Sequence, residues 1–366
     1  SFGLQKNGEC SRNTVIGGRI AFYMQRNSKC DDNIIPSSAG EGIFFAGPSY
    51  DNSISGNIIK GSTADSIKIQ NQLEHTPLLA GQTVRGNTIS GNTITNAGNI
   101  GITLSGISTA QVRGNTFANN IIDTPSFHGF YLQDASENTF VGNSIINPNE
   151  SNASRGSGFY LVVRNTKNVF SSNVVKDDRA TTRMNYSFCN REDNTCTENI
   201  LSGNQFNGKS TDRNVWIQSN NFTITGNHIE GGAYAGLYLD GASYATVVGN
   251  TFLNNTNDSN NSWGEIWCGN SATNNLIDGN VFNSTATNKA RSGIWFQSTG
   301  DTLNKVGKNI YNGMVTLQID NSGTANDLSV HNVSGVNSGD NAPNSLYSGL
   351  SADIALKAPI ASPTFT

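Results

Sequence analysis

The sequence predicts an all-β fold, a single-stranded right-handed parallel β-helix of about 12 coils with a short irregular C-terminal tail. A hydrophobic-x-hydrophobic segment recurs twelve times, and a Gly-Asn step or a close relative follows each copy by about ten residues. The clearest copies are GFYLQDASENTFVGN at 129–143 and GLYLDGASYATVVGN at 236–250. The repeats alternate with period two and are rich in Gly, Asn, Ser and Thr, which excludes helical repeats.

Each repeat has room for three short strands and three turns, which would coil once around a narrow apolar core. Two inward positions are apolar in every repeat, although only 35% of the chain is hydrophobic. The second lies two residues after the first, and the first is expected at Phe22, Ile43, Ile67, Ile102, Phe130, Phe159, Tyr186, Val215, Leu237, Ile266, Ile294 and Leu317. Asn tolerates the left-handed backbone region and can stack in one turn. We expect such a stack at Asn57, Asn87, Asn115, Asn143, Asn173, Asn204, Asn227, Asn250 and Asn280.

Two segments are expected, a β-helix at 1–333 and a Ser/Asn/Gly-rich region with a linker-like tail at 334–366. The chain already reads as part of a coil at its start, so we expect it to be a piece of a longer protein. Only 14% of the residues are charged and the net charge is −4, which argues against a nucleic-acid partner. No apolar stretch is long enough for membrane insertion. Cys10 with Cys30, and Cys189 with Cys196, could be disulfides or free thiols.

Between the two inward positions lies one outward position, and it is aromatic in eight of the twelve repeats. The expected column is Tyr23, Phe44, Lys68, Thr103, Tyr131, Tyr160, Ser187, Trp216, Tyr238, Trp267, Trp295 and Gln318. The next outward position is mostly polar and includes Gln133, Gln218, Asp240 and Gln297. Aromatic rings beside amides and carboxylates suit the C–H faces and hydroxyl groups of a polysaccharide. A subunit interface, or a cover formed by the chain's own loops, would use the same column.

Glycoside hydrolysis requires two carboxyl groups roughly 5 to 10 Å apart. Asp240 and Glu265 are expected to point outward on adjacent coils, with backbones about 8 Å apart, and are the predicted acid/base couple. Asp134, beside Gln133 and Tyr131, is the alternative catalytic partner. These carboxylates could equally be solvated sugar ligands. A lyase or epimerase would instead need a cation, and the candidates are Arg85 and Arg113, which are expected to stack outward, and Arg164 and Arg213, which flank the aromatic strand. The four His residues are scattered, so no metal site or cofactor is predicted.

The repeats resemble the β-helix coils shared by bacteriophage tailspikes, pectate lyases and related carbohydrate-active proteins. The tail LKAPIASPTFT, residues 356–366, closely resembles a linker that recurs in phage tail fibres. The resemblance to tailspike and tail-fibre proteins implies a homotrimer in the virion tail, attached to other virion tail proteins and binding surface glycans of a bacterial host. Many relatives cleave those glycans, but no strict family motif assigns catalytic residues to this sequence.

Together these observations favour an extracellular tailspike that binds, and hydrolyses, a bacterial surface polysaccharide. The substrate-binding residues expected from the two outward columns are Tyr131, Tyr160, Trp216, Tyr238, Trp267, Trp295, Gln133, Gln218 and Gln297. A non-catalytic adhesive or structural tail fibre is one alternative, and a lyase or epimerase acting on a uronate polymer is another. A secreted protein of non-viral origin is the alternative location.

Overall fold

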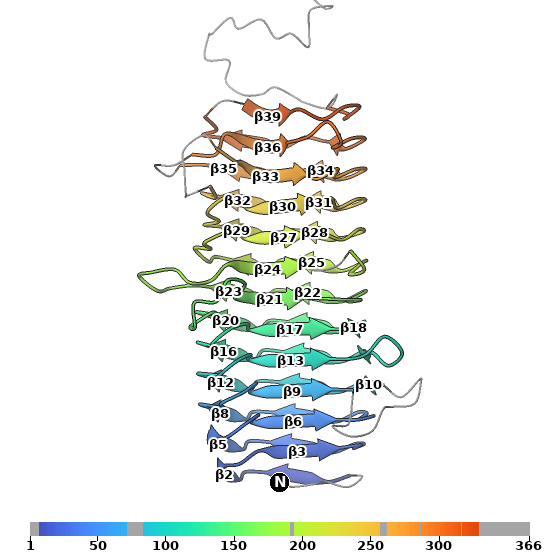
Figure 1. Ribbon diagram of the computed structural model, residues 1–366, viewed down its shortest axis with the longest axis vertical. Coiled ribbons are helices and arrows are strands. Elements are labelled where there is room, and N and C mark those ends of the chain that lie inside the picture. Colours follow the sequence, from blue (N-terminus) through green and yellow to red (C-terminus); the bar gives the residue numbers. More distant parts are fainter. Residues whose placement is uncertain are drawn as a thin grey trace, which may run out of the picture. The chain divides into compact units, whose positions relative to one another are not determined.

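The computed structural model describes residues 7–71, 83–190, 194–256, 262–285, 287, 289–315 and 317–328. In these ranges the chain forms strands and turns without helices, and three 12-stranded sheets and one 3-stranded sheet are present. Nearly every ladder joins a strand to the equivalent strand of the next coil, and all are parallel (Figure 1). The predicted parallel β-helix of about 12 coils is therefore confirmed. The tail at 334–366 lies outside the described residues.

Each coil passes in order through sheets B, C and A. Sheet B contains β1 (Glu9–Ser11), β4 (Lys29–Asp31), β7 (Ser53–Ser55), β11 (Thr88–Ser90), β15 (Thr116–Ala118), β19 (Thr139–Val141), β22 (Val169–Ser171), β25 (Ile200–Ser202), β28 (Thr223–Thr225), β31 (Thr246–Val248), β34 (Leu276–Asp278) and β37 (Lys305–Val306). Sheet C contains β2 (Thr14–Gly17), β5 (Ile34–Ser38), β8 (Ile58–Lys60), β12 (Thr93–Thr95), β16 (Ile121–Asp123), β20 (Ser144–Ile146), β23 (Val174–Lys176), β26 (Gln205–Phe206), β29 (His228–Glu230), β32 (Thr251–Leu253), β35 (Val281–Asn283) and β38 (Ile310–Asn312).

Sheet A carries the segments that define the repeat. It contains β3 (Ile20–Tyr23), β6 (Ile43–Ala46), β9 (Ile67–Gln70), β13 (Ile102–Ser105), β17 (Phe130–Gln133), β21 (Ser157–Leu161), β24 (Tyr186–Asn190), β27 (Val215–Ile217), β30 (Leu237–Asp240), β33 (Gly264–Gly269), β36 (Ser292–Phe296) and β39 (Leu317–Asn321). A short sheet D follows sheet A in three coils and contains β10 (Val84–Arg85), β14 (Val112–Arg113) and β18 (Ala135–Ser136).

The core is one continuous apolar column inside the coils. Most strands of sheets B and C are three residues long and turn only their central residue inward, as the alternation of side chains requires. Equivalent side chains stack from coil to coil. The rings of Phe117, Phe140 and Phe170 lie nearly parallel, with successive centroids 4.9 and 4.7 Å apart. Stacking of like residues explains why the repeat tolerates insertions only in its turns.

The predicted register is wrong by two residues in three coils. Ile20, not Phe22, pairs with Ile43. As a result Met24, predicted to be inward, is 53% exposed. The outward column therefore holds Ala21, Cys189 and Asp320 where Tyr23, Ser187 and Gln318 were expected. A shift of two keeps every side chain on its own face, so hydrophobic alternation cannot detect it.

The buried Asn residues form two ladders, where the sequence predicted one. The longer ladder runs through Asn13, Asn33, Asn57, Asn92, Asn120, Asn143, Asn173, Asn204, Asn227, Asn250, Asn280 and Asn309. Asn87 and Asn115 belong to the second ladder. In the longer ladder each Asn amide donates to the next Asn and to a backbone carbonyl, as Asn143 does to Asn173 and Phe117. The ladders thereby satisfy polar groups inside an apolar coil.

All five cysteines are free thiols. Cys10 and Cys30 are paired in register on β1 and β4, and both side chains face the core. Cys189 and Cys196 are buried and also unbridged. Of the two possibilities that the sequence leaves open, the structure has the free thiols.

Candidate functional site

The outer face of sheet A carries an aromatic row over four successive coils. Trp216, Tyr238, Trp267 and Trp295 are paired in strict register on β27, β30, β33 and β36. Their ring centroids are separated in turn by 5.3, 4.2 and 5.5 Å. The rings lie in contact because residues in register on parallel strands repeat at about 4.8 Å, within the range of centroid separations of aromatic pairs.

Loops of the chain cover most of this row. Only 7% of Trp216, 4% of Tyr238 and 5% of Trp267 is exposed. The guanidinium of Arg213 lies 4.8 Å from the ring centroid of Trp216 and 4.7 Å from that of Trp267, and Trp263 packs against Trp267 at 4.8 Å. The rings are therefore not the open surface that the sequence suggested, and a cover formed by the chain itself accounts for their burial. Trp295 remains half-buried.

The polar tips of these aromatic side chains converge on one edge of the row. The indole N–H of Trp216 donates to Asp240 Oδ2 at 3.0 Å, and the hydroxyl of Tyr238 donates to Asp240 Oδ1 at 3.1 Å. The indole N–H of Trp267 donates to Gln297 Oε1 at 2.9 Å. Asn270 donates a further hydrogen bond to Asp240. We call Asp240, Asn270 and Gln297 the polar row. Asp240 and Gln297 accept hydrogen bonds from buried aromatic side chains, and Asn270 donates to Asp240. Asn270 and Gln297 are exposed.

The structure does not bring Asp240 and Glu265 together. Leu237 pairs with Ile266, so Glu265 lies opposite Gly236, four residues along the strand from Asp240. At about 3.3 Å per residue and about 4.8 Å per coil, their backbones are about 14 Å apart, beyond the separation that a glycosidase pair uses. The predicted offset of two residues is wrong.

Glu265 also points in a different direction from the one predicted. It lies at the corner between sheets C and A, where Gly129 and Gly158 hold the equivalent positions of other coils and have no room for a Cβ. Its side chain is fully buried and accepts a hydrogen bond of 2.7 Å from Asn255, while its Oε1 has no partner. Burial raises the pKa of Glu265 to about 7. The Glu265 carboxyl group therefore lies inside the coil and not on the outer face of sheet A.

Asp134 is buried in an ion pair. Its side chain has no exposed surface and accepts hydrogen bonds from both Nε and Nη2 of Arg164, the second at 3.0 Å. Its backbone is left-handed, with φ of 50°, where the chain leaves β17. The two hydrogen bonds from Arg164 engage both carboxylate oxygens of Asp134 and stabilise this turn.

The other two predicted tyrosines, Tyr131 and Tyr160, form a separate pair in earlier coils. Tyr131 and Tyr160 are in register, with ring centroids 6.2 Å apart, and the Tyr131 hydroxyl lies 3.4 Å from Gln133 Oε1. His128 stacks on Tyr160 at 4.4 Å, and burial lowers the pKa of His128 to about 3. Cys189 takes the next aromatic position and separates this pair from Trp216.

Three residues of this face were not found from the sequence. Tyr234 and Trp263 precede strands of sheet A, and Asn270 follows β33, so all three lie outside the alternating segment. Arg213, which was expected to flank the aromatic strand, also pairs with Asp212 at 2.6 Å, and Asp212 accepts a hydrogen bond of 2.9 Å from Tyr186. An aromatic residue just before a repeat strand would have been the available signal. Gln218 follows Ile217 on β27 and is half-buried.

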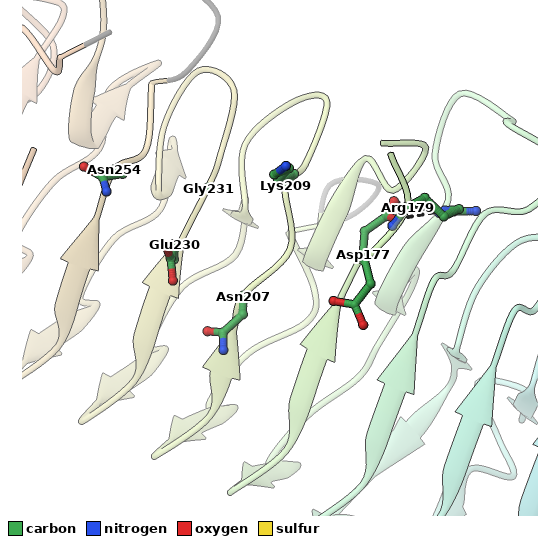
Figure 2. A pocket seen from close by; sticks show the side chains of 8 residues that line it. Asp177, Arg179, Asn207, Lys209, Glu230, Gly231 and Asn254 are labelled. Carbon is green, nitrogen blue, oxygen red and sulfur yellow. Dashed lines mark hydrogen bonds and ion pairs between the residues drawn. The ribbon is translucent and has the colours of Figure 1, made fainter. Parts of the chain in front are cut away.

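A second feature is a polar cleft at the end of sheet C (Figure 2). It has a volume of about 360 Å³ and is lined by residues at the ends of sheet C strands and in the turns that follow them, Asp177, Asp178, Arg179, Asn207, Lys209, Glu230, Gly231 and Asn254. The carboxylate of Asp177 is already bound by Arg179 Nε at 2.8 Å and Nη2 at 2.7 Å. Although burial opposes it, these hydrogen bonds and those from backbone N–H groups lower the pKa of Asp177. The cleft therefore offers a mixed polar wall with its most buried charge neutralised.

No group of three or more His, Cys, Asp or Glu in the described residues could hold a metal ion. No helix in the same residues is long and apolar enough to cross a membrane.

Two family models match parts of the sequence. Residues 4–124 match the model of the family described as periplasmic copper-binding protein (NosD), and residues 69–206 match that of the right handed beta helix region. The described part of 4–124 contains no group of three or more His, Cys, Asp or Glu residues that could hold a metal ion. No curated protein matches the sequence.

Solved structures with a similar fold include alginate epimerases and a phage tailspike. The A-module of the mannuronan C-5 epimerase AlgE4 of Azotobacter vinelandii superposes with a TM-score of 0.55 at 13% identity, covering 86% of this chain and 91% of that one. The periplasmic alginate epimerase AlgG gives 0.52 at 12% identity, covering 86% and 76%. The Dettilon tailspike protein gives 0.51 at 16% identity, covering 87% of this chain and 61% of the tailspike. What the chain shares with all of them is the right-handed parallel β-helix.

Proposed function

We propose that the chain binds an extended bacterial surface polysaccharide along the outer face of sheet A, at the polar row and Trp295. The observation that carries this proposal is the set of three hydrogen bonds from Trp216, Tyr238 and Trp267 to Asp240 and Gln297. These bonds orient acceptors and donors before any ligand arrives, which lowers the entropic cost of binding.

The chemistry of the face suits sugars. Sugar hydroxyl groups need both donors and acceptors, and Asp240, Asn270 and Gln297 supply both on adjacent coils. The partly exposed ring of Trp295 can pack against an apolar sugar face, and Arg291 lies over it at 5.5 Å from the ring centroid. The positions repeat at about 4.8 Å, so a chain that runs along the stack can contact several coils.

Hydrolysis is a further prediction that depends on Asp240. Of the three predicted catalytic carboxylates, Asp240 alone is at the edge of the face, with 9% of its surface exposed. Glu265 and Asp134 make internal contacts. Binding is therefore better supported than cleavage, and Asp240 is the residue whose removal tests cleavage.

The source and partners that we propose are those of a phage tailspike, with a homotrimer in the virion tail and a bacterial host glycan as receptor. Support comes from the likeness of the tail at 356–366 to tail-fibre linkers and from the fold shared with the Dettilon tailspike. The second candidate is an epimerase or lyase acting on a uronate polymer. The fold shared with the alginate epimerases and the exposed pair Arg85 and Arg113 favour that candidate.

The test is a binding and cleavage assay with bacterial capsules, O-antigens and alginate. Binding without products supports the binding proposal, new reducing ends indicate hydrolysis, and unsaturated-uronate absorbance indicates a lyase. Conversion of mannuronate to guluronate, measured by NMR, would indicate an epimerase. Reducing ends that persist in Asp240→Asn would remove Asp240 from catalysis. A Trp295→Ala variant that binds as well as Ile310→Ala, an exposed apolar control on sheet C, would contradict the proposed face.

A further inference from the structure

A notch interrupts the column of turn residues between sheets D and B. The residues of this column have left-handed backbones on successive coils, at Asn27, Asp51, Gly86, Gly114, Glu137 and Lys167. Gly86 and Gly114 have no side chains, and the carboxylate of Asp51 lies over Gly86, so the column is open at Gly114, between Asp51 and Glu137. A Cβ on Gly114 would meet nothing within 4 Å. The resulting cleft has a volume of about 450 Å³.

Two arginines form the wall of this notch. Arg85 on β10 and Arg113 on β14 are paired in register, so their backbones are about 4.8 Å apart. Both are exposed, and neither forms an ion pair in the described chain, although Asp51 and Glu137 line the same cleft. Arg85 also lies over the ring of Tyr50, 5.1 Å from its centroid. Like charges directly opposite each other on neighbouring strands are unfavourable unless an anion lies between them.

The side chains that line the notch suit a ligand with one carboxylate and several hydroxyl groups. Two adjacent guanidinium groups provide several N–H donors for one planar carboxylate. Asp51 and Glu137 at the two ends are acceptors, so they repel a simple inorganic anion and attract hydroxyl donors. A group with one carboxylate and several hydroxyls matches both parts of the lining.

We propose that the notch formed by Asp51, Arg85, Gly86, Arg113, Gly114 and Glu137 is a binding subsite for a uronic acid residue of an acidic polysaccharide. The carboxylate of the sugar binds Arg85 and Arg113, and its hydroxyls donate to Asp51 and Glu137. The subsite lies on β10 and β14, several coils before the polar row, and is a separate place of contact. For a polymer that contacts both places, this inference rests on the proposed function. Binding of a short oligomer to the notch does not require the aromatic face.

The experiment is calorimetric titration of the full chain with trigalacturonate, maltotriose and sodium sulfate. We expect trigalacturonate to bind and both controls to bind at least tenfold more weakly. Changing both Arg85→Gln and Arg113→Gln should weaken trigalacturonate binding at least tenfold. The double variant Lys29→Gln with Lys60→Gln changes the charge equally at exposed sites of sheets B and C and should leave binding unchanged.

Filling the notch supplies an independent variant that keeps both arginines. Gly114→Asn places a side chain in it, and Asn tolerates the φ of 61°. Gly91→Asn, at a φ of 63° in the turn between sheets B and C, is the matched control. We expect weaker binding only for Gly114→Asn, with unchanged melting temperatures in both.

Equal binding by the arginine variant and its lysine control would overturn the inference. Sulfate binding as tight as trigalacturonate binding would also overturn it, because the site would then be a general anion site. If wild-type protein binds a neutral polysaccharide but not trigalacturonate, the inference fails while the proposed function stands. Loss of trigalacturonate binding in Trp295→Ala but not in the arginine double variant would place the acidic sugar at the aromatic face and overturn the inference.

Discussion

Trp216 donates its indole N–H to Oδ2 of Asp240, on the next coil, at 3.0 Å. The contact joins a ring that packs under Arg213 to a carboxylate at the edge of sheet A. It shows how the coil stack produces a polar site. Buried aromatic side chains stay apolar along their faces and place their N–H and O–H groups at one edge, where they fix Asp240 and Gln297.

Tyr238→Phe tests whether the hydrogen bonds that orient Asp240 contribute to polysaccharide binding. The variant removes the hydroxyl that donates to Asp240 and keeps the ring that stacks on Trp267. We expect a loss of about 1 kcal/mol in the free energy of unfolding, typical of one hydrogen bond, and several-fold weaker polysaccharide binding. Chemical denaturation and calorimetric titration measure the two effects. Tyr244→Phe, at a tyrosine that is 61% exposed, is the control, and equal binding by both variants would exclude this role.

Glu265 should make stability depend on pH. Its folded pKa of about 7 lies above the ordinary value of 4.5 for a glutamate, so the folded state binds the proton more tightly than the unfolded state does. The stabilisation is complete below about pH 4.5 and is lost as the pH rises to about 7, a change of about 3 kcal/mol. Glu265→Gln should remove this component. Urea unfolding of both proteins at pH 5 and pH 8 measures the difference, and parallel pH profiles would contradict the assignment.

The Asn ladder should be sensitive at single positions. Asn143→Ala removes the donor to Phe117 O and the acceptor for both the backbone N–H and the amide of Asn120. Unsatisfied buried groups are costly, so we expect a loss on the order of 3 kcal/mol. Asn312→Ala, at an exposed Asn of β38, should change stability by less than about 0.5 kcal/mol. Similar melting temperatures for the two variants would show that the ladder contributes little.

The ion pair of Asp134 with Arg164 should be structural. Arg164→Gln leaves a buried carboxylate without its cation, and we expect a loss on the order of 2 kcal/mol, because Arg164 is itself 43% exposed. Arg183→Gln breaks an exposed pair with Glu150 and should cost less than about 1 kcal/mol. Adding Asp134→Asn to Arg164→Gln should recover part of the lost stability. A further loss in the double variant would contradict the structural role.

The fold could be predicted from the sequence because each inward residue stacks on its equivalent in the next coil, as Phe140 does on Phe170. The register of β3, β24 and β39 could not be predicted, since a shift of two residues leaves the hydrophobic pattern unchanged. The register of Trp216, Tyr238, Trp267 and Trp295 on the outer face was predicted correctly, but the burial of three of these rings was not. The inward direction of Glu265 was missed because it depends on the bend of the corner, and Trp263 was missed because it lies before β33, outside the alternating segment.

The central claim is that polysaccharide binds at the aromatic and polar face of sheet A. All four tryptophans of the chain, Trp216, Trp263, Trp267 and Trp295, lie in the aromatic cluster of this face, so intrinsic tryptophan fluorescence reports on this place alone. The direct measurement is a fluorescence titration with a polysaccharide whose binding is established by calorimetry. We predict a saturable change in emission with the calorimetric affinity, which Trp295→Ala weakens. Tight binding with unchanged emission would contradict the claim and place the glycan elsewhere on the coils.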